Sequence, residues 1–161
     1  MRDRGGLWYI RFMKSTYDKI WESALRVVQA RMISRANLER KLKTRYPGEE
    51  GYIIQILDEM ERVELINDRR YTEQLISHLT QRPIGRLKIM VEFRKRGLDQ
   101  DLIEPFLLQA GYNEEEACKK ALDEKAKNVR ESDPRKRKQK LMNFLRNRGF
   151  KDAVIYKTLR P

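Results

Sequence analysis

"FRKRGLDQDLI" at residues 93–103 returns as "LRNRGFKDAVI" at residues 145–155. In both stretches an apolar residue leads into Arg-x-Arg-Gly, and another apolar residue, a short polar gap and a second apolar run follow. A shift of 52 residues (149 − 97) superposes Gly97 on Gly149 and carries the agreement across the flanking positions. A pattern of this length within one small chain indicates a structural module that is used more than once.

An earlier copy of the module precedes these two. A shift of 51 residues (89 − 38) places Leu38 on Ile89 and Leu42 on Phe93. Apolar residues around these positions recur every three or four residues, as in amphipathic helices, and no segment alternates as a strand does. A unit of about 50 residues with so narrow an apolar stripe buries too little surface alone, so neighbouring units are expected to share a core. We therefore predict an all-α fold, an elongated tandem array of three three-helix repeats: a basic and aromatic N-terminal segment at 1–15, repeat 1 at 16–66, repeat 2 at 67–111 and repeat 3 at 112–161.

Capping residues and glycines mark the expected ends of the helices. Ser34, Asn113 and Asp133 each precede an amphipathic stretch and can accept hydrogen bonds from its first backbone N–H groups. Gly97 and Gly149 are expected to close the middle helices of repeats 2 and 3 in equivalent settings, because glycine readily adopts the left-handed conformation that follows a helix. The residues expected to be buried on those two helices are Leu87, Val91, Leu141 and Leu145.

The balance of charges limits the classes of protein to which the chain can belong. Charged residues make up 37% of the 161 residues and the formal net charge is +12, which indicates a polyanionic partner such as nucleic acid. Cys118 is the only cysteine, so an intramolecular disulfide is excluded and a reducing cytoplasm is expected. No stretch approaches the roughly 20 apolar residues that span a bilayer, and no secretory signal follows the basic N-terminus. A soluble cytoplasmic protein without a membrane partner is predicted.

Basic residues recur at matching positions of the repeats. Cations near a helix C-terminus also complement the helix dipole by about 0.3–1 kcal/mol each, and many charged stretches are simply solvated faces, so these explanations stand beside a binding role. They account less well for cations early in a middle helix, such as Lys88 and Lys138, where the dipole disfavours positive charge. The candidate residues for binding a polyanionic partner are Arg35, Lys43, Arg45, Arg86, Lys88, Arg94, Arg96, Arg135, Lys136, Arg137, Lys138, Lys140, Arg146 and Arg148.

Residues suited to catalysis are sparse. His78 is the only histidine, and it is expected to be a partly buried neutral side chain rather than a base or a ligand. Cys118 stands among small residues and is expected to be buried rather than nucleophilic. The sequence contains neither a glycine-rich phosphate loop nor an aspartate-rich metal loop. We predict a protein that is not an enzyme and that uses no metal and no other cofactor.

The N-terminal stretch "LWYIRFMKSTY" interleaves aromatic and basic residues. Trp8, Phe12 and their basic neighbours could stack on nucleic-acid bases. The interpretation that we favour is a flanking helix packed on repeat 1.

Four stretches resemble the RecX family of regulatory proteins, which modulate the RecA recombinase. They are "ALRVVQARMISRANLERKL", "LINDRRYTEQLI", "GRLKIMVEFRKRGL" and "LMNFLRNRGF". Each motif is weak alone, but their order and spacing over residues 21–159 are fairly specific. The sequence departs from the residues usual in the family at Asn37, Asn67 and Tyr71-Thr72. These departures do not change the predicted order of helices.

The resemblance implies a non-enzymatic inhibitor built from tandem three-helix repeats. Its partner would be the RecA filament, in whose groove it would bridge neighbouring subunits close to the DNA. It would limit filament growth and suppress ATP turnover and strand exchange in DNA recombination, DNA repair and the SOS response. We expect a monomer that also binds single- and double-stranded DNA without sequence preference, through phosphate contacts.

Two alternatives come from other classes of protein. In the first, the units are helix-turn-helix modules that read DNA sequence, although Arg86 and Lys88 suit phosphates better than base edges. In the second, the chain is a helical scaffold that binds no nucleic acid, and its net charge of +12 argues against that.

Some members of the RecX family carry extra segments at either end, so a chain that stops at Pro161 is compatible with a fragment.

Overall fold

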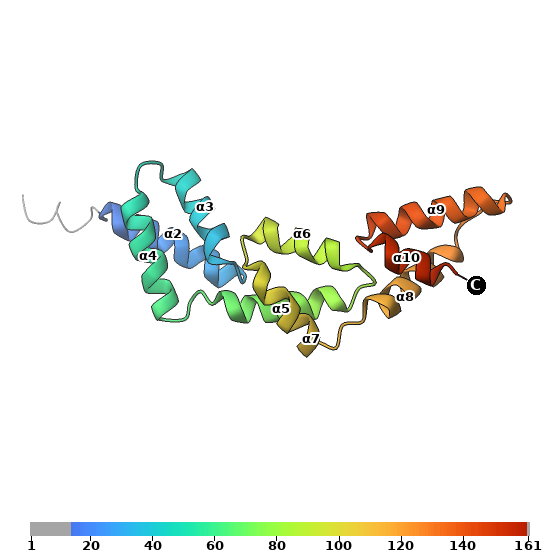
Figure 1. The fold of residues 1–161 in the computed structure, drawn as a ribbon. Coiled ribbons are helices and arrows are strands. Elements are labelled where there is room, and N and C mark those ends of the chain that lie inside the picture. Colours follow the sequence, from blue (N-terminus) through green and yellow to red (C-terminus); the bar gives the residue numbers. More distant parts are fainter. Residues whose placement is uncertain (1–13, 161) are drawn as a thin grey trace, which may run out of the picture. The chain divides into compact units, whose positions relative to one another are not determined.

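The computed structural model describes residues 14–160, and every regular element among them is helical (Figure 1). The predicted all-α class is confirmed, and the helices follow one another in three groups of three. The chain divides within α5 into two compact units, one ending at Tyr71 and the other beginning at Thr72. The elements are α2 (Thr16–Ala30), α3 (Arg35–Arg45), α4 (Glu50–Arg62), α5 (Asp68–Thr80), α6 (Arg86–Arg96), the short 3-10 helix η1 (Gln100–Leu102), α7 (Ile103–Gln109), α8 (Glu114–Ala126), α9 (Pro134–Asn147) and α10 (Asp152–Thr158).

The predicted N-terminal segment lies almost wholly outside the described residues, and so do Trp8 and Phe12. Its last residue, Ser15, caps α2 in a reciprocal arrangement with Asp18, whose backbone N–H donates to the Ser15 hydroxyl at 3.1 Å. On α2 itself, Tyr17 stacks on Trp21 with ring centroids 6.4 Å apart.

The first unit is built around α2, α3 and α4, which pack on one another. Its core includes Leu38 and Leu42 from α3 and Ile53, Ile56 and Leu57 from α4, all of them almost completely excluded from solvent. Each such side chain contributes about 1.5–3 kcal/mol through the removal of apolar surface from water. The apolar period read from the sequence therefore identifies the buried face of this unit correctly.

The second unit contains the rest of α5 and the elements from α6 to α10. Residues 72–111 bury Leu75, Ile89 and Phe93, and α8, α9 and α10 enclose a core that includes Cys118 and Phe150. Burial raises the pKa of the Cys118 thiol, with a contact to Thr158 acting in the opposite direction. The expectation that Cys118 is buried is confirmed.

The predicted helix starts carry side-chain caps. The Ser34 hydroxyl accepts from the Asn37 N–H at 3.3 Å. The Asn113 carboxamide oxygen accepts from two N–H groups in the first turn of α8, and the Asp133 carboxylate does the same for α9. These caps satisfy N–H groups that have no partner inside the helix.

Gly97 and Gly149 occupy equivalent helix ends, as predicted. Both have positive φ, 63° and 84°. The N–H of the apolar residue after each glycine donates back into the helix, from Leu98 to the Phe93 carbonyl at 3.1 Å and from Phe150 to the corresponding carbonyl at 3.3 Å. Leu98 and Phe150 are both buried, so the repeated phrase marks a repeated way of ending a helix.

The prediction that Leu87 and Val91 are buried is wrong. They are 44% and 38% exposed, whereas Ile89 and Phe93 of the same helix are completely buried. The internal repeat explains the difference, because a shift of 52 places Leu87 and Val91 on Gln139 and Asn143, which are polar. The predicted burial of Leu141 and Leu145 on α9 is confirmed.

The expectation for His78 is also wrong, because its side chain is exposed. The buried face of α5 carries Thr72, Leu75, Ile76 and Leu79. His78 lies about 100° around the helix from Leu79 and about 60° from Leu75, so it borders this buried face, and its side chain remains exposed.

Backbone contacts join the second and third groups of helices. The Gly85 N–H donates to the Arg148 carbonyl at 2.9 Å, and the Leu87 N–H donates to the Gly149 carbonyl at 3.0 Å. A Cβ atom at Gly85 would lie 2.2 Å from the Gly149 oxygen, and one at Gly149 would lie 2.4 Å from the Lys88 nitrogen. Only glycine allows the two backbones to approach this closely.

Another type of contact between successive groups of helices is found at two places. The N–H of Arg35, the first residue of α3, donates to the Asp68 carboxylate at 2.8 Å. The N–H of Arg86, the first residue of α6, donates to the Glu114 carboxylate at 2.9 Å. Asp68 and Glu114 are the first residues of α5 and α8, so in both cases an acid from the next group caps the middle helix.

We predict that Gly149→Ala lowers the free energy of unfolding by at least about 2 kcal/mol, because the new methyl group meets the Lys88 backbone and the positive φ becomes strained. Gly51→Ala is the matched control, since nothing lies within 4 Å of its Cβ position. The control is expected to be neutral or stabilising by up to about 1 kcal/mol. Urea denaturation followed by circular dichroism measures both, and equal stability of the two variants would contradict the close contact.

Glu64 provides a second prediction, because it has a positive φ of 56° where a glycine is usual. The N–H groups of Leu65 and Ile66 both donate to the Met60 carbonyl, and α7 ends in the same way at Gly111. Glu64→Gly is expected to stabilise the chain by about 0.5–1 kcal/mol through relief of this strain. Glu64→Ala keeps the strain while removing the charge, so a gain of the same size in that variant would point to electrostatics instead.

Candidate nucleic-acid interface

The candidate cations fall into three groups according to what their side chains contact. Some form ion pairs with carboxylates: Arg35, Lys43, Arg86, Arg96, Lys140 and Arg146. Others contact an aromatic ring or a backbone carbonyl: Arg45, Arg137 and Arg148. Within residues 14–160 the rest have no side-chain ion pair or hydrogen bond: Lys88, Arg94, Arg135, Lys136 and Lys138.

Arg35 and Arg86 tie helices together. The Arg35 guanidinium binds Asp58 at 2.7 Å and also Glu61, both on α4. Burial by itself would lower the pKa of Arg35, but these two carboxylates raise it overall. The Arg86 guanidinium binds Glu104 on α7 at 2.8 Å. Both arginines therefore link the middle helix of a group to its third helix, which makes them less available to an external phosphate.

Two of the remaining ion pairs are largely exposed and local. Lys43 pairs with Glu39 within α3, and Arg146 pairs with Asp152 at the start of α10. Exposed pairs of this kind contribute little to stability and weaken with salt. Such a cation can exchange its carboxylate for a phosphate without disturbing the fold.

Within residues 14–160, the N-terminal half of α9 carries the densest group of exposed cations without a side-chain partner. Arg135 and Lys136 lie in its first turn, and Lys138 follows in the next. The Asp133 side chain binds the backbone N–H groups of Arg135 and Lys136, at 2.8 and 3.3 Å, but not their side chains. Positive charge at this end opposes the helix dipole, so helix stability does not explain these residues.

Two cations near α9 are not among the residues predicted from the sequence. Lys125 at the end of α8 and Arg130 in the following segment line a pocket together with α9 residues. They stand in a stretch of mixed charge, so charge density alone does not distinguish them.

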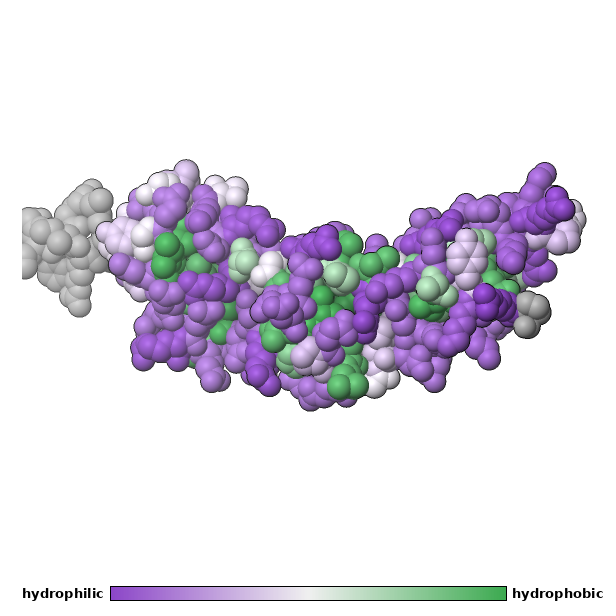
Figure 2. All heavy atoms as spheres, in the orientation of Figure 1, coloured by the Kyte–Doolittle hydropathy of each residue, from purple (hydrophilic) through white to green (hydrophobic). Residues whose placement is uncertain are grey.

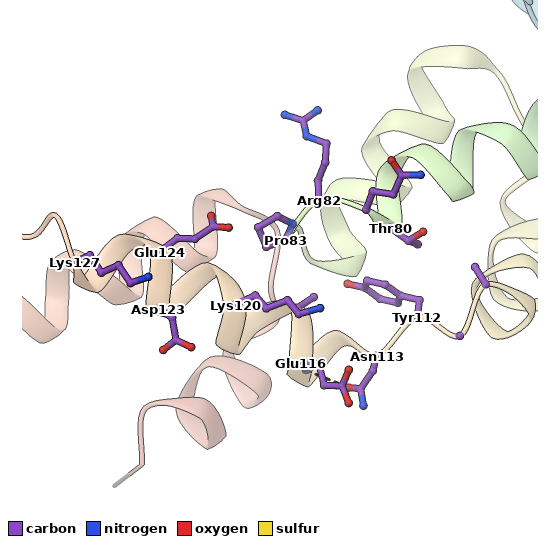
Figure 3. Close-up of a pocket in the computed structure, with 14 residues that line it drawn as sticks. Thr80, Arg82, Pro83, Tyr112, Asn113, Glu116, Lys120, Asp123, Glu124 and Lys127 are labelled. Atoms are coloured by element: carbon purple, nitrogen blue, oxygen red, sulfur yellow. Dashed lines mark hydrogen bonds between the residues drawn. The ribbon is translucent and has the colours of Figure 1, made fainter.

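A pocket of about 410 Å³ between the second and third groups has a different character (Figure 3). In Figure 3, Glu116, Lys120 and Asp123 project from α8, and Arg82 extends away from the other labelled side chains. Positive and negative side chains are balanced around this pocket: Arg82, Lys120 and Lys127 against Glu116, Asp123 and Glu124. It therefore does not favour a polyanion.

On the face shown in Figure 2, hydrophilic residues cover most of the surface and hydrophobic side chains form smaller patches. Among residues 14–160, no three histidine, cysteine, aspartate or glutamate side chains come together as a set of metal ligands. None of the helices in that range has both the length and the apolar character needed to cross a membrane.

Comparison with known proteins identifies the family. Residues 113–159, which span α8, α9 and α10, match the family model described as "RecX, third three-helix domain". Over 138 residues the chain is 33% identical to the regulatory protein RecX of Pelodictyon phaeoclathratiforme, covering 85% of this chain and 84% of that protein. The chain belongs to the RecX family of regulatory proteins. A further RecX protein, from Chlorobaculum tepidum, is 32% identical over 140 residues, covering 86% of this chain and 85% of its own length.

Solved RecX structures share the fold. The crystal structure of RecX from Lactobacillus salivarius matches with a TM-score of 0.73 at 22% identity, covering 89% of this chain and 94% of that chain. A second crystal structure of a regulatory protein RecX matches with a TM-score of 0.76, also at 22% identity, covering 98% of this chain and 79% of that one. The resemblance to the RecX family drawn from the motifs is thus confirmed.

The cations in the first turn of α9 lead to a prediction about stability. The double variant Arg135→Glu, Lys136→Glu is expected to raise the free energy of unfolding by about 0.5–2 kcal/mol at low salt, because acids suit the helix N-terminus. Arg146→Glu should lower stability, since it places an acid near the C-terminus and breaks the pair with Asp152. Thermal denaturation at low and high salt measures both effects. A loss of stability in the double variant would mean that these cations support the RecX fold itself.

Proposed function

We propose that the chain is a monomeric, cytoplasmic, non-enzymatic regulator that binds the RecA filament and its DNA. It would inhibit filament growth, ATP turnover and strand exchange in recombination and repair, through repeats at 16–66, 67–111 and 112–161. Membership of the RecX family supports this proposal. The observation that carries it is the recurrence of exposed cations on consecutive middle helices, where Lys88 and Arg94 on α6 correspond to Lys140 and Arg146 on α9.

The exposed face of α6 suits a protein partner. Leu87, Val91 and Arg94 follow the i, i+4, i+7 spacing that aligns side chains along one side of a helix, and all three are exposed. Apolar side chains beside arginine are typical of protein–protein contacts, whereas phosphate contacts need only cations and hydrogen-bond donors. The corresponding positions on α9, Gln139 and Asn143, are polar. We therefore assign the recombinase contact to the second repeat and the DNA contact to the third.

This division of roles accounts for inhibition by few molecules. A regulator that holds a filament subunit with one repeat and the adjacent DNA with another blocks further addition at that point. One molecule then affects many subunits of the growing filament. Binding to DNA alone would require enough protein to cover the strand.

The alternative function is DNA binding without sequence preference, through the basic middle helices. The exposed cations of α9 support it, because lysine and arginine in the first turns of a helix bind phosphates without reading bases. Such binding weakens steeply with salt, since each phosphate contact releases counterions.

Titration of RecA activity distinguishes the two functions. The purified chain is expected to hydrolyse no ATP and to slow the DNA-dependent ATPase of RecA from the same organism at well below one molecule per RecA subunit. The assay is run at two DNA concentrations. Inhibition that tracks only the fraction of DNA covered would refute the filament mechanism and leave DNA binding as the function.

Surface variants separate the two contacts. Leu87→Ser with Val91→Ser is expected to abolish inhibition of the ATPase while affinity for DNA is retained, because both side chains are exposed and lie outside the core. Leu108→Ser is the control, since it removes an 84% exposed leucine from α7 rather than α6. Equal loss of inhibition in the two variants would show that the α6 face has no special role.

A further inference from the structure

The third repeat contains a pocket of about 480 Å³ formed by the end of α8, the segment after it and α9. Helix α9 contributes Lys140, Asn143, Phe144 and Asn147 at the i, i+3, i+4, i+7 spacing of one helix face. The opposite wall is provided by Lys125, Asn128, Val129 and Arg130. The pocket lies on the same helix as the exposed cations Lys136 and Lys138, one to three turns further along.

The side chains lining the pocket carry positive charge and no carboxylate. Lys125 Nζ lies 5.2 Å from the centroid of the Phe144 ring, and Arg148 Cζ, which is outside the pocket lining, lies 5.0 Å from it, so two cations lie close to the aromatic ring. Lys140 is bound to Glu131 at 2.6 Å, which leaves Lys125 and Arg130 as the lining cations without a carboxylate partner in the described part of the chain. This environment favours an anionic ligand.

Three carboxamides give the pocket hydrogen-bonding groups that a simple phosphate site does not need. Asn128, Asn143 and Asn147 each offer both a donor and an acceptor, and all three are exposed. Gln139 Nε2 donates to the Asn143 oxygen at 2.9 Å, which orients that carboxamide and leaves its amino group available. Asparagine side chains pair with the edges of nucleic-acid bases, which likewise present donors and acceptors together.

Two neighbouring pockets lack this combination. The one between the second and third repeats balances its charges, and the one beside Leu107 and Leu108 on α7 pairs its single cation, Arg86, with Glu104 and contains no carboxamide. The α8–α9 pocket, by contrast, brings cations, carboxamides and an aromatic ring together. An aromatic side chain within a positively charged groove is the usual arrangement for binding unpaired nucleotides.

We infer that the α8–α9 pocket receives one nucleotide of single-stranded DNA, with the base between Phe144 and the asparagines and the phosphate at Lys125 and Arg130. This inference rests on the proposed function in that it takes DNA as a partner, and it adds a preference for single strands. In a duplex the bases are stacked and paired, so a base can enter a pocket only after the helix opens. The exposed cations on the first turns of α9 bind phosphates of either form.

Binding of fluorescent DNA tests the inference on the full chain. Affinity is measured by anisotropy for an oligo(dT) strand and for a duplex of the same length, at one salt concentration. Asn143→Ala with Asn147→Ala is expected to weaken binding of the single strand about tenfold and to leave duplex affinity unchanged. Both residues are exposed, so folding should be preserved, and circular dichroism checks this. Phe144→Leu, which keeps an apolar side chain but removes the ring, should show the same selective loss.

The matched control is Arg135→Ala with Lys136→Ala, which removes exposed cations outside the pocket. It should weaken binding of the single strand and of the duplex by the same factor. The inference is overturned if the pocket variants also weaken both forms equally, or if neither pocket variant changes affinity for the single strand. These outcomes are independent of the RecA assay. If the chain does not inhibit the RecA ATPase but its pocket variants lose single-strand affinity selectively, only the proposed function is refuted. If the chain inhibits the ATPase but the pocket variants show no selective loss, only the pocket inference is refuted.

Discussion

The hydrogen bond from the first backbone N–H of a middle helix to an acid of the next repeat is the contact on which the architecture depends. Each three-helix group has only a narrow apolar core, and Asp68 and Glu114 bring the start of the following group onto the N-termini of α3 and α6. Burial raises the pKa of the Asp68 carboxyl, and the N–H of Arg35 opposes that rise. The carboxylate is thus partly removed from water, and the positive end of the helix dipole of α3 compensates part of the lost hydration. Between the second and third groups the glycine contacts add a steric constraint and two backbone hydrogen bonds.

The sequence predicts the helices well because their signals are local. Ser34, Asn113 and Asp133 act on N–H groups two or three residues away, and Gly97 and Gly149 require only their own backbone conformation. Burial is harder to predict where a helix is apolar on several sides. Leu87 and Val91 are as hydrophobic as Ile89, and only comparison with the polar equivalents on α9 indicates which face is buried. The left-handed Glu64 could not be predicted either, since no glycine stands there to indicate the turn.

The candidate site was predicted at the level of charge but not of contacts. The repeated charge pattern identified Arg35 and Arg86 as candidate binding residues. It could not show that each forms ion pairs with carboxylates on the third helix of its group. Those carboxylates lie between 18 and 26 residues away in the sequence, beyond the range of helix periodicity. The pocket on α9 depends in the same way on residues from α8 that meet it only after folding. Charge repeats therefore locate a surface, and tertiary packing decides which of its cations can reach a ligand.

The burial of Cys118 has a practical consequence. It is the only thiol in the chain, it is completely excluded from solvent, and its raised pKa keeps the reactive thiolate scarce. A cysteine introduced at an exposed position such as Leu108 would therefore react with a maleimide dye far faster than the native one. The wild-type background can carry a single spectroscopic reporter without prior removal of any residue. Two such cysteines on different helices, labelled as a donor and acceptor pair, would measure the distance between those helices in solution, molecule by molecule.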